Sequence, residues 1–169
     1  MPITPFHFGP GAALHAIAPR QVSFLAFCAA NVLIDLESLS NLVAQRYPVH
    51  AFFHTYVGAT LIVVVTMLLF FAARGTAARV ALPNLFEWKA LRPPQVLAGA
   101  AAGAYSHVVL DSIMHADMSP LAPFSDVNPL LGAISLEGLH WFCFGGAVFA
   151  LLVLGIRRLV GRGNDHGSA

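Results

Sequence analysis

The chain has 169 residues, of which 57% are hydrophobic and only 10% are charged. A soluble domain of ordinary composition carries about 25% charged residues, so this chain cannot cover a water-facing surface in the usual way. The composition excludes a disordered chain, a nucleic-acid binder with a basic face and most soluble enzymes. The length and the apolar runs predict one membrane-embedded helical domain over residues 1–160, followed by a polar, disordered tail at 161–169.

Five apolar stretches follow one another along the chain. The first, at 3–18, is short and contains Pro10, so it predicts a short, tilted or re-entrant helix that stops at Pro19. The other four are each close to the about 20 residues that a helix needs to cross the hydrocarbon layer. They lie at 21–39, 51–73, 95–114 and 138–156. We therefore expect an all-α integral membrane bundle of four full transmembrane helices plus a short N-terminal helix.

The basic residues are distributed unevenly between the two ends of these predicted helices. Of the nine Lys and Arg residues, all but Arg46 lie in the turn after the first stretch, in the connection 74–94 or at the C-terminal end. Lys and Arg concentrate in cytoplasmic loops of membrane proteins. The distribution therefore predicts a bacterial plasma membrane protein with a cytoplasmic C-terminus and with the loop 115–137 outside.

Acidic residues and histidines gather at the opposite, outer end of the predicted bundle. Carboxylates at this density repel one another unless a cation is bound among them. We therefore expect a cluster of metal ligands at the extracytoplasmic end. The residues at this end are Asp35, Glu37, Asp111, Asp117, Asp126, Glu137, His50, His54, His107, His115 and His140, joined by His7 if the first stretch runs inward from outside.

The spacing of the histidines favours metal binding. His107, Asp111 and His115 are four residues apart, so on one helix they form a single stripe. His50 and His54 have the same spacing, and we expect them in the first turn of the helix 51–73. Two imidazoles placed in this way present two nitrogens to one metal ion.

Asp35 and Glu37 cannot share a face of a regular helix. They predict a helix that ends there, with both carboxylates turned toward the same centre. Asp117 follows in a segment that Pro120 and Pro123 force into an extended path.

Some of these residues also have a simpler interpretation. A lone histidine in an apolar helix is usually a satisfied polar group between helices, which is how we interpret His15 and His140. His50 and His54 could face lipid headgroups. Asp111 is harder to explain without a ligand, because a carboxylate one turn inside the bilayer costs about 3 kcal/mol unless it is paired.

Four segments carry a resemblance to a known family. They are TPFHFGPG (4–11), LIDLESL (33–39), HAFFHTY (50–56) and SHVVLDSIMHADMSPLAPFS (106–125). In this order they resemble the small multi-pass membrane-bound metal-dependent hydrolases. The resemblance implies a helical membrane fold, a metal site built from these histidines and acids, and hydrolytic activity.

Mixed imidazole and carboxylate ligands suit Zn²⁺, with Mn²⁺ or Fe²⁺ as alternatives, and the set is large enough for one or two ions. We expect Asp111 to bridge the two ions and Asp117 or Glu37 to act as general acid or base. The expected reaction is cleavage of a phosphoester or related bond of a lipid or lipid-linked substrate at the outer membrane–water interface by a metal-activated water. The candidate metal ligands are His7, Asp35, His50, His54, His107, Asp111 and His115.

Three other functions remain open from the sequence. The same cluster could be the outer site of a metal-ion or proton-coupled transporter. A transporter would normally continue with polar groups through the membrane core, but the stretches 57–73 and 141–156 contain no Asp, Glu, Lys, Arg or His. A haem-binding bundle would need histidines near mid-depth without a crowd of carboxylates. A non-catalytic module could use the metal only to hold its helices together.

Overall fold

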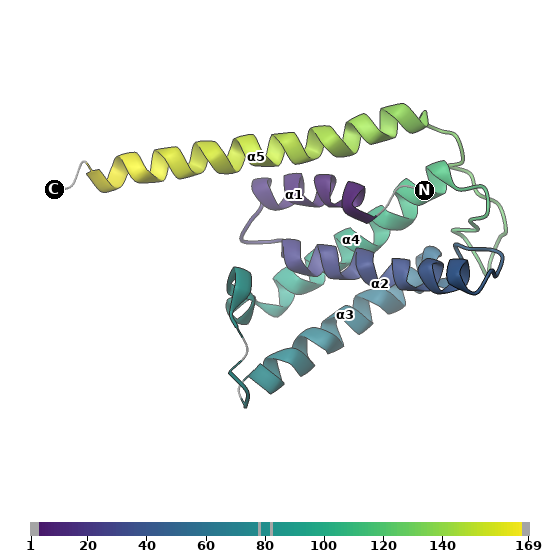
Figure 1. Ribbon diagram of the computed structural model, residues 1–169, viewed down its shortest axis with the longest axis horizontal. Coiled ribbons are helices and arrows are strands. Elements are labelled where there is room, and N and C mark those ends of the chain that lie inside the picture. The colour runs from purple at the N-terminus through teal and green to yellow at the C-terminus, as the bar shows by residue number, and fades with distance from the viewer. Residues whose placement is uncertain (1–3, 78, 82, 167–169) are drawn as a thin grey trace.

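The computed structural model describes residues 4–166 except 78 and 82. This part of the chain is all-helical and contains no strand, and four of its five α-helices are long and apolar enough to cross a membrane, which confirms the predicted fold class (Figure 1). The α-helices are α1 (Phe8–Ile17), α2 (Phe24–Val43), α3 (Tyr56–Ala77), α4 (Pro93–Met114) and α5 (Leu136–His166), and the short 3-10 helices are η1 (Thr4–His7), η2 (Phe52–His54) and η3 (Leu85–Ala90).

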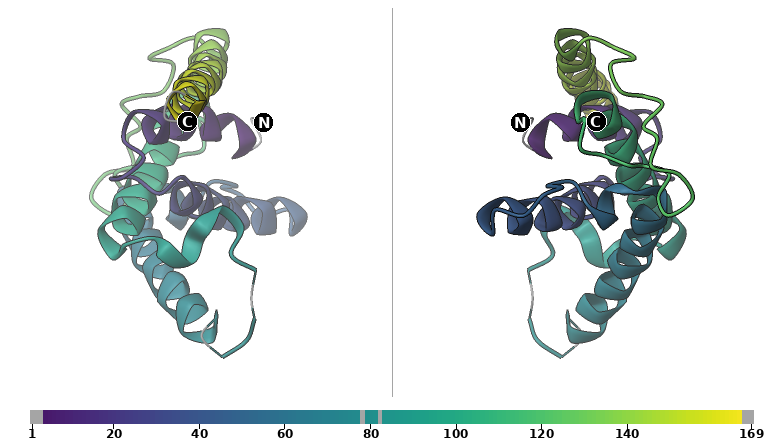
Figure 2. Two further views of the ribbon diagram at one scale, coloured as in Figure 1. Left: turned by 90° about the vertical axis from the view of Figure 1, so that its left-hand side faces the viewer. Right: turned by 90° about the vertical axis from the view of Figure 1, so that its right-hand side faces the viewer.

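The helices form a bundle in which α2 and α4 occupy the middle. Seen along its length, the bundle has α1 and α5 on one side of this central pair and α3 on the other (Figure 2). Helix α5 continues to His166, past the boundary that we predicted at residue 160, and the last three residues of the predicted tail lie outside the described residues.

Helix α1 is too short to cross the bilayer and packs along the first half of α5 (Figure 1). Its 10 residues span about 15 Å, half of the hydrocarbon thickness of about 30 Å. Gly9 allows the close approach, because a side chain there would collide with the backbone carbonyl of Cys143. This packing holds the preceding η1, and with it His7, at the end of the bundle where α5 begins.

A seam of close contact joins α2 and α4. A side chain at Gly99 would collide with the backbone of Ser23, and one at Gly103 with the backbone carbonyl of Phe27. The glycines therefore let the two helix backbones touch, as small residues do in membrane helix pairs. Both helices run in the same direction along this seam.

The seam determines which polar residues meet at its outer end. Continuing from Gly103 in steps of four residues, α4 presents His107 and then Asp111. Continuing from Phe27 in the same steps, α2 presents Asn31 and then Asp35. Because the two helices are in register at the glycines, these four side chains are brought together one and two turns further on.

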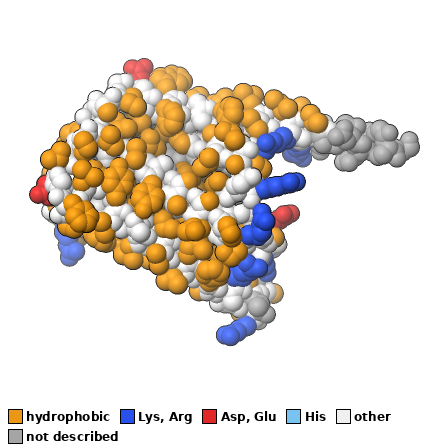
Figure 3. Space-filling view, turned by 180° about the vertical axis from the view of Figure 1, so that it is seen from behind, with side chains coloured by type: hydrophobic (Ala, Val, Ile, Leu, Met, Phe, Trp, Pro, Cys, Tyr) orange, Lys and Arg blue, Asp and Glu red, His pale blue; other side chains and the backbone are white. Residues whose placement is uncertain are grey.

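Lys and Arg side chains gather at the other end of the bundle, beside the last part of α5 (Figure 3). There the side chain of Arg92 donates to the carbonyl of Arg20 at 3.4 Å, and that of Arg74 donates to the carbonyl of Leu91 at 3.2 Å. We call this the basic end. Arg46 lies in the loop after α2, at the opposite end, as the sequence predicts.

Candidate metal centre

Among the described residues, two groups of side chains are arranged so that they could hold a metal ion. The first, which we call the buried group, consists of Asp35 from α2, His54 from η2, and His107 and Asp111 from α4. One nitrogen or oxygen atom from each residue lies within 4.8 Å of the corresponding atom of the others. Residues distant in the sequence thus converge at the outer end of the α2–α4 seam.

The distances within the buried group match those between ligands of one ion. Nε2 of His107 lies 3.3 Å from Oδ1 of Asp35 and 3.3 Å from Oδ2 of Asp111. Nε2 of His54 lies 3.7 and 3.8 Å from the same two oxygens. A tetrahedral Zn²⁺ with ligands at about 2.0–2.1 Å separates its ligand atoms by about 3.3–3.4 Å. The four atoms therefore surround a space of the right size for such an ion.

The buried group also leaves polar atoms without hydrogen bonds. Its ring nitrogens and carboxylate oxygens point toward one another from a buried site, where an unpaired polar group costs about 1–3 kcal/mol. Two carboxylates with neutral imidazoles carry a charge that one divalent cation neutralises. The buried atoms that find no hydrogen-bond partner among the described residues are Nδ1 of His7, both ring nitrogens of His54, Nε2 of His107 and Oδ1 of Asp111.

His7 lies at the margin of the buried group. Its Nε2 is 3.0 Å from Oδ1 of Asp111, although the two are not aligned as a hydrogen bond, and its ring lies 4.5 Å from that of His107. Its side chain is buried. The first apolar stretch therefore begins at the outer end, which is the condition under which the sequence places His7 in the cluster.

Asn31, which the sequence analysis missed, orients His107. Its Oδ1 accepts a hydrogen bond from Nδ1 of His107 at 2.9 Å, while its own Nδ2 donates to the carbonyl of Phe27 at 2.8 Å. The second bond fixes which way the amide faces. The proton of His107 is therefore on Nδ1, and the lone pair of Nε2 faces Asp35 and Asp111, as is usual for metal-binding histidines.

Glu37 has an equivalent relation to His54. Its carboxylate accepts the backbone N–H groups of Phe52 at 3.1 Å and Phe53 at 2.7 Å, and Oε2 lies 3.7 Å from Nδ1 of His54. The imidazole of His54 is thus placed between Glu37 on one side and Asp35 on the other. The predicted helix end at this acidic pair is wrong, because α2 continues to Val43 and the longer Glu37 side chain reaches η2 from a regular helix.

The second group, which we call the loop group, consists of His50, His115 and Asp117. Nδ1 of His50 lies 2.9 Å from Oδ1 of Asp117, whose Oδ2 accepts the backbone N–H groups of Val49 at 2.9 Å and His50 at 3.1 Å. The rings of His50 and His115 are stacked at 3.9 Å. The loop group is adjacent to the buried group, since the rings of His50 and His54 are 4.8 Å apart.

Two predicted helical spacings are wrong. His50 and His54 do not share a helical turn, because α3 begins only at Tyr56, after Thr55 caps it by accepting the N–H of Gly58 at 2.9 Å. His115 does not extend the stripe of His107 and Asp111, because α4 ends at Met114 and the backbone of His115 is extended. The side chain of His115 joins His50 instead. Asp111 therefore groups with His107 but not with His115.

Neighbouring charges and burial shift the pKa values of the groups outside the helices. Burial alone would lower the pKa of His54, but the carboxylates of Asp35 and Glu37 outweigh it and raise the pKa above its usual 6.5. Burial and the nearby His50 lower the pKa of His115. Burial would raise the pKa of Asp117, but its bonds from His50 and Val49 lower it below 3.8.

The remaining residues that the sequence placed at the outer end belong to neither group. Asp126 and Glu137 are exposed, and His140 lies against the ring of Phe6 at 5.1 Å. His15, at the basic end, donates from Nδ1 to the carbonyl of Val22 at 2.8 Å, as expected for a satisfied histidine between helices.

Access to the buried group is from the side of Asp35. The side chain of Asp35 is 26% exposed, whereas those of His54, His107 and Asp111 are at most 4% exposed. Comparison of the chain with protein-family models, curated proteins and solved structures finds no match.

Proposed function

We propose that this protein is a membrane-bound metal-dependent hydrolase, of the kind that its sequence motifs resemble. The observation that carries the proposal is the buried group, in which two imidazoles and two carboxylates converge at ligand distances. Nε2 of His54 and Nε2 of His107, which face the carboxylates, make no hydrogen bond to any described residue. Buried carboxylates and histidines within a membrane bundle are costly, and they are retained where they serve a function.

The buried group fits Zn²⁺ by its donor types and by the separation of its donor atoms. Mn²⁺ and Fe²⁺ accept the same ligands. A divalent ion there would supply Lewis acidity and would lower the pKa of a water molecule to about 7. The loop group is the place for a second ion, next to the first, with His50 and His115 as its nitrogen ligands.

The contacts of Glu37 and Asp117 support a positioning role more than the general acid or base role that the sequence suggests. Glu37 holds the backbone of η2 and faces Nδ1 of His54. Asp117 holds the backbone at His50 and faces Nδ1 of that residue. Carboxylates placed behind metal-binding imidazoles fix their orientation and raise their basicity.

The proposed substrate is a lipid or lipid-linked phosphoester, because both groups lie near one end of the helices that are long and apolar enough to cross the membrane, close to where lipid headgroups would be. We propose that this end faces outside and that the C-terminus is cytoplasmic in a bacterial plasma membrane. Lys and Arg concentrate at the other end (Figure 3), as they do in the cytoplasmic loops of membrane proteins.

The test is metal content measured together with hydrolysis on protein purified in detergent. Elemental analysis should find a bound transition metal, and a panel of phospholipids and isoprenoid phosphates should contain a substrate. Asp111→Asn and His107→Ala should lose both the metal and turnover, at least about 100-fold, because each removes a ligand. His15→Ala is the matched control, since His15 is bonded to Val22 at the basic end, and it should retain both.

The same experiment separates the alternative functions. Bound metal with no hydrolysis of any substrate, together with metal uptake by liposomes that contain the protein, would favour a transporter. Bound metal with neither activity, together with a lower Tm after chelation, would favour a structural metal. Purified protein without metal, and without the capacity to bind it, would refute the proposed centre.

A further inference from the structure

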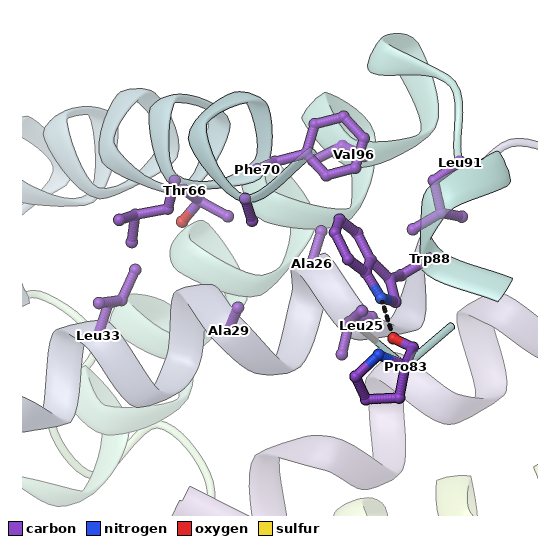
Figure 4. Close-up of a pocket in the computed structure, with 12 residues that line it drawn as sticks. Leu25, Ala26, Ala29, Leu33, Thr66, Phe70, Pro83, Trp88, Leu91 and Val96 are labelled. Carbon is purple, nitrogen blue, oxygen red and sulfur yellow. Dashed lines mark hydrogen bonds between the residues drawn. The ribbon is translucent and has the colours of Figure 1, made fainter. Parts of the chain in front are cut away.

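An apolar cavity of about 420 Å³ lies between α2 and α3 near the basic end. The two helices diverge toward this end (Figure 1), and the segment around η3 covers part of the space between them. In the close-up, Trp88 and Leu91 lie at one end of the cavity, and Leu33 and Thr66 at the other (Figure 4). The cavity is of the size of a ligand pocket, about 300–1,000 Å³.

The lining of the cavity offers a ligand no unpaired polar side chain among the described residues. The hydroxyl of Thr66 donates to the carbonyl of Ile62 in its own helix at 2.8 Å. The indole N–H of Trp88 donates to the carbonyl of Pro83 at 2.9 Å (Figure 4). The rest of the lining consists of Leu, Ala, Phe, Pro and Val side chains. Such a cavity is suited to a hydrocarbon chain and not to a polar molecule.

The length of the cavity matches one leaflet of a bilayer. On α2 its lining runs from Leu25 to Leu33, which is about 12 Å along a helix that rises about 1.5 Å per residue. Half of the hydrocarbon core is about 15 Å. The cavity therefore extends from the interface at the basic end to near the middle of the membrane, the depth that an acyl chain of that leaflet occupies.

The rim of the cavity carries a positive charge. The guanidinium of Arg74 lies 5.8 Å above the ring of Phe70 and donates to the carbonyl of Leu91, and both of these residues line the cavity. A guanidinium has several N–H donors, so this one bond leaves others for a phosphate oxygen. Trp88, also at the rim, is the type of residue found at membrane interfaces. Arg79 and Arg92 lie on the segments that flank the rim.

We propose that this cavity binds one acyl chain of an anionic phospholipid from the leaflet at the basic end, with its phosphate held by Arg74. The charge at the rim selects the anionic headgroup, and the apolar walls hold the chain. The site is separate from the metal centre, so this proposal does not depend on hydrolysis.

The proposal is tested by fluorescence quenching of Trp88. The chain contains two tryptophans, so Trp141→Phe leaves Trp88 as the single tryptophan, whose fluorescence can be excited selectively over that of tyrosine. The protein is reconstituted in phosphatidylcholine vesicles that contain a small fraction of phospholipid with brominated acyl chains, either phosphatidylglycerol or phosphatidylcholine. Brominated phosphatidylglycerol should quench Trp88 with about fivefold higher affinity, as expected for one basic side chain near the surface.

Two pairs of variants, all in the Trp141→Phe background, separate the site from general attraction to the basic end. Arg74→Gln should abolish the preference for phosphatidylglycerol, whereas Arg157→Gln, on α5 at the same end, should retain it. Ala73→Phe narrows the cavity and should reduce quenching by both lipids, whereas Ala72→Phe, the adjacent position that does not line the cavity, should leave quenching unchanged. Equal quenching by the two lipids, equal effects of the two arginine variants, or equal effects of the two phenylalanine variants would each overturn the proposal.

Discussion

Replacing Asn31 with leucine should weaken metal binding without removing any metal ligand. Asn31 is fully buried, and its Oδ1 accepts the proton on Nδ1 of His107 at 2.9 Å. Leucine has a similar volume but no acceptor. The N–H of His107 would then be buried and unpaired, and the imidazole could turn or shift its proton to Nε2, the atom that faces Asp35 and Asp111.

The expected magnitude follows from the role of such partners. Loss of the group behind a metal-binding histidine reduces metal affinity about 10- to 100-fold. At about 1.4 kcal/mol per factor of ten, this corresponds to about 1.4–2.8 kcal/mol. The unpaired N–H should also lower the stability of the metal-free protein by about 1–3 kcal/mol.

The assay is competition for zinc between the purified protein and a chelator of known affinity, with Tm measured on metal-free protein. Asn31→Asp retains an acceptor for His107 and should preserve most of the affinity, which a purely space-filling role would not explain. Thr66→Val is the control, because it removes another buried hydrogen bond that lies in α3 and not at the centre. An unchanged zinc affinity in Asn31→Leu, or an equal loss in both Asn31 variants, would refute the reasoning.

Three further predictions concern pH and orientation. The lowered pKa of Asp117 means that its carboxylate stabilises the fold above its unfolded pKa of 3.8, and that this contribution is lost as the pH falls through the folded value. Asp117→Asn should therefore lower the free energy of unfolding by about 1 kcal/mol at pH 7 and leave it unchanged at the acid limit, as measured by thermal unfolding at both pH values. The raised pKa of His54 means that a proton competes with the ion for this imidazole as the pH falls. The Kd for zinc should therefore already increase while the pH is still above 6.5, by about tenfold for each pH unit below the raised pKa, and a Kd that stays constant down to pH 6.5 would contradict this. In intact cells an impermeant thiol reagent should label a cysteine at Asp126 and not one at Thr76, in a chain freed of its native cysteines, and the reverse pattern would invert the proposed orientation.

The presence of the long helices was predictable because it depends on hydrophobicity alone. Apolar runs of the length of a bilayer predict spanning helices whatever their neighbours are, and the structure contains four helices that are long and apolar enough to span. The gathering of acids and histidines at one end was visible for a similar reason. Helices that cross a membrane alternate in direction, so the ends at which residues lie follow from their order along the chain.

The local geometry of the centre was less predictable, because it depends on where each helix stops. The position of His115 is set by the end of α4, and that of His54 by the cap at Thr55. Thr55 before the apolar run is a signal for a helix start that could have been recognised, since a threonine at the N-cap accepts a backbone N–H. The extended backbone of His115 depends on the loop that follows it, which no helical spacing describes.

Asn31 could have been found from the four-residue spacing of two helix faces. One face of α4 reads Gly99, Gly103, His107 and Asp111, and one face of α2 reads Ser23, Phe27, Asn31 and Asp35. Glycines at this spacing indicate a close helix pair, and polar residues that continue the same face indicate where the pair becomes functional. What the spacing does not contain is the partner of each helix, so the pairing of Asn31 with His107 required the structure.

The candidate metal centre and the apolar cavity are related through the position of α3. At its outer end α3 is tied to its neighbours: the N–H of Tyr56 donates to the carbonyl of Pro120 at 2.9 Å, and Glu37 of α2 binds the backbone just before it. These bonds bring His54 to the buried group. Over its whole length α3 packs more closely on α4 than on α2, and toward the basic end it diverges from α2 (Figure 1). The apolar cavity lies in the space between α2 and α3. Helix α3 is thus held at its outer end by the contacts of the candidate centre. At its other end it leaves an apolar cavity whose lining runs about 12 Å along α2, the place of the proposed acyl chain.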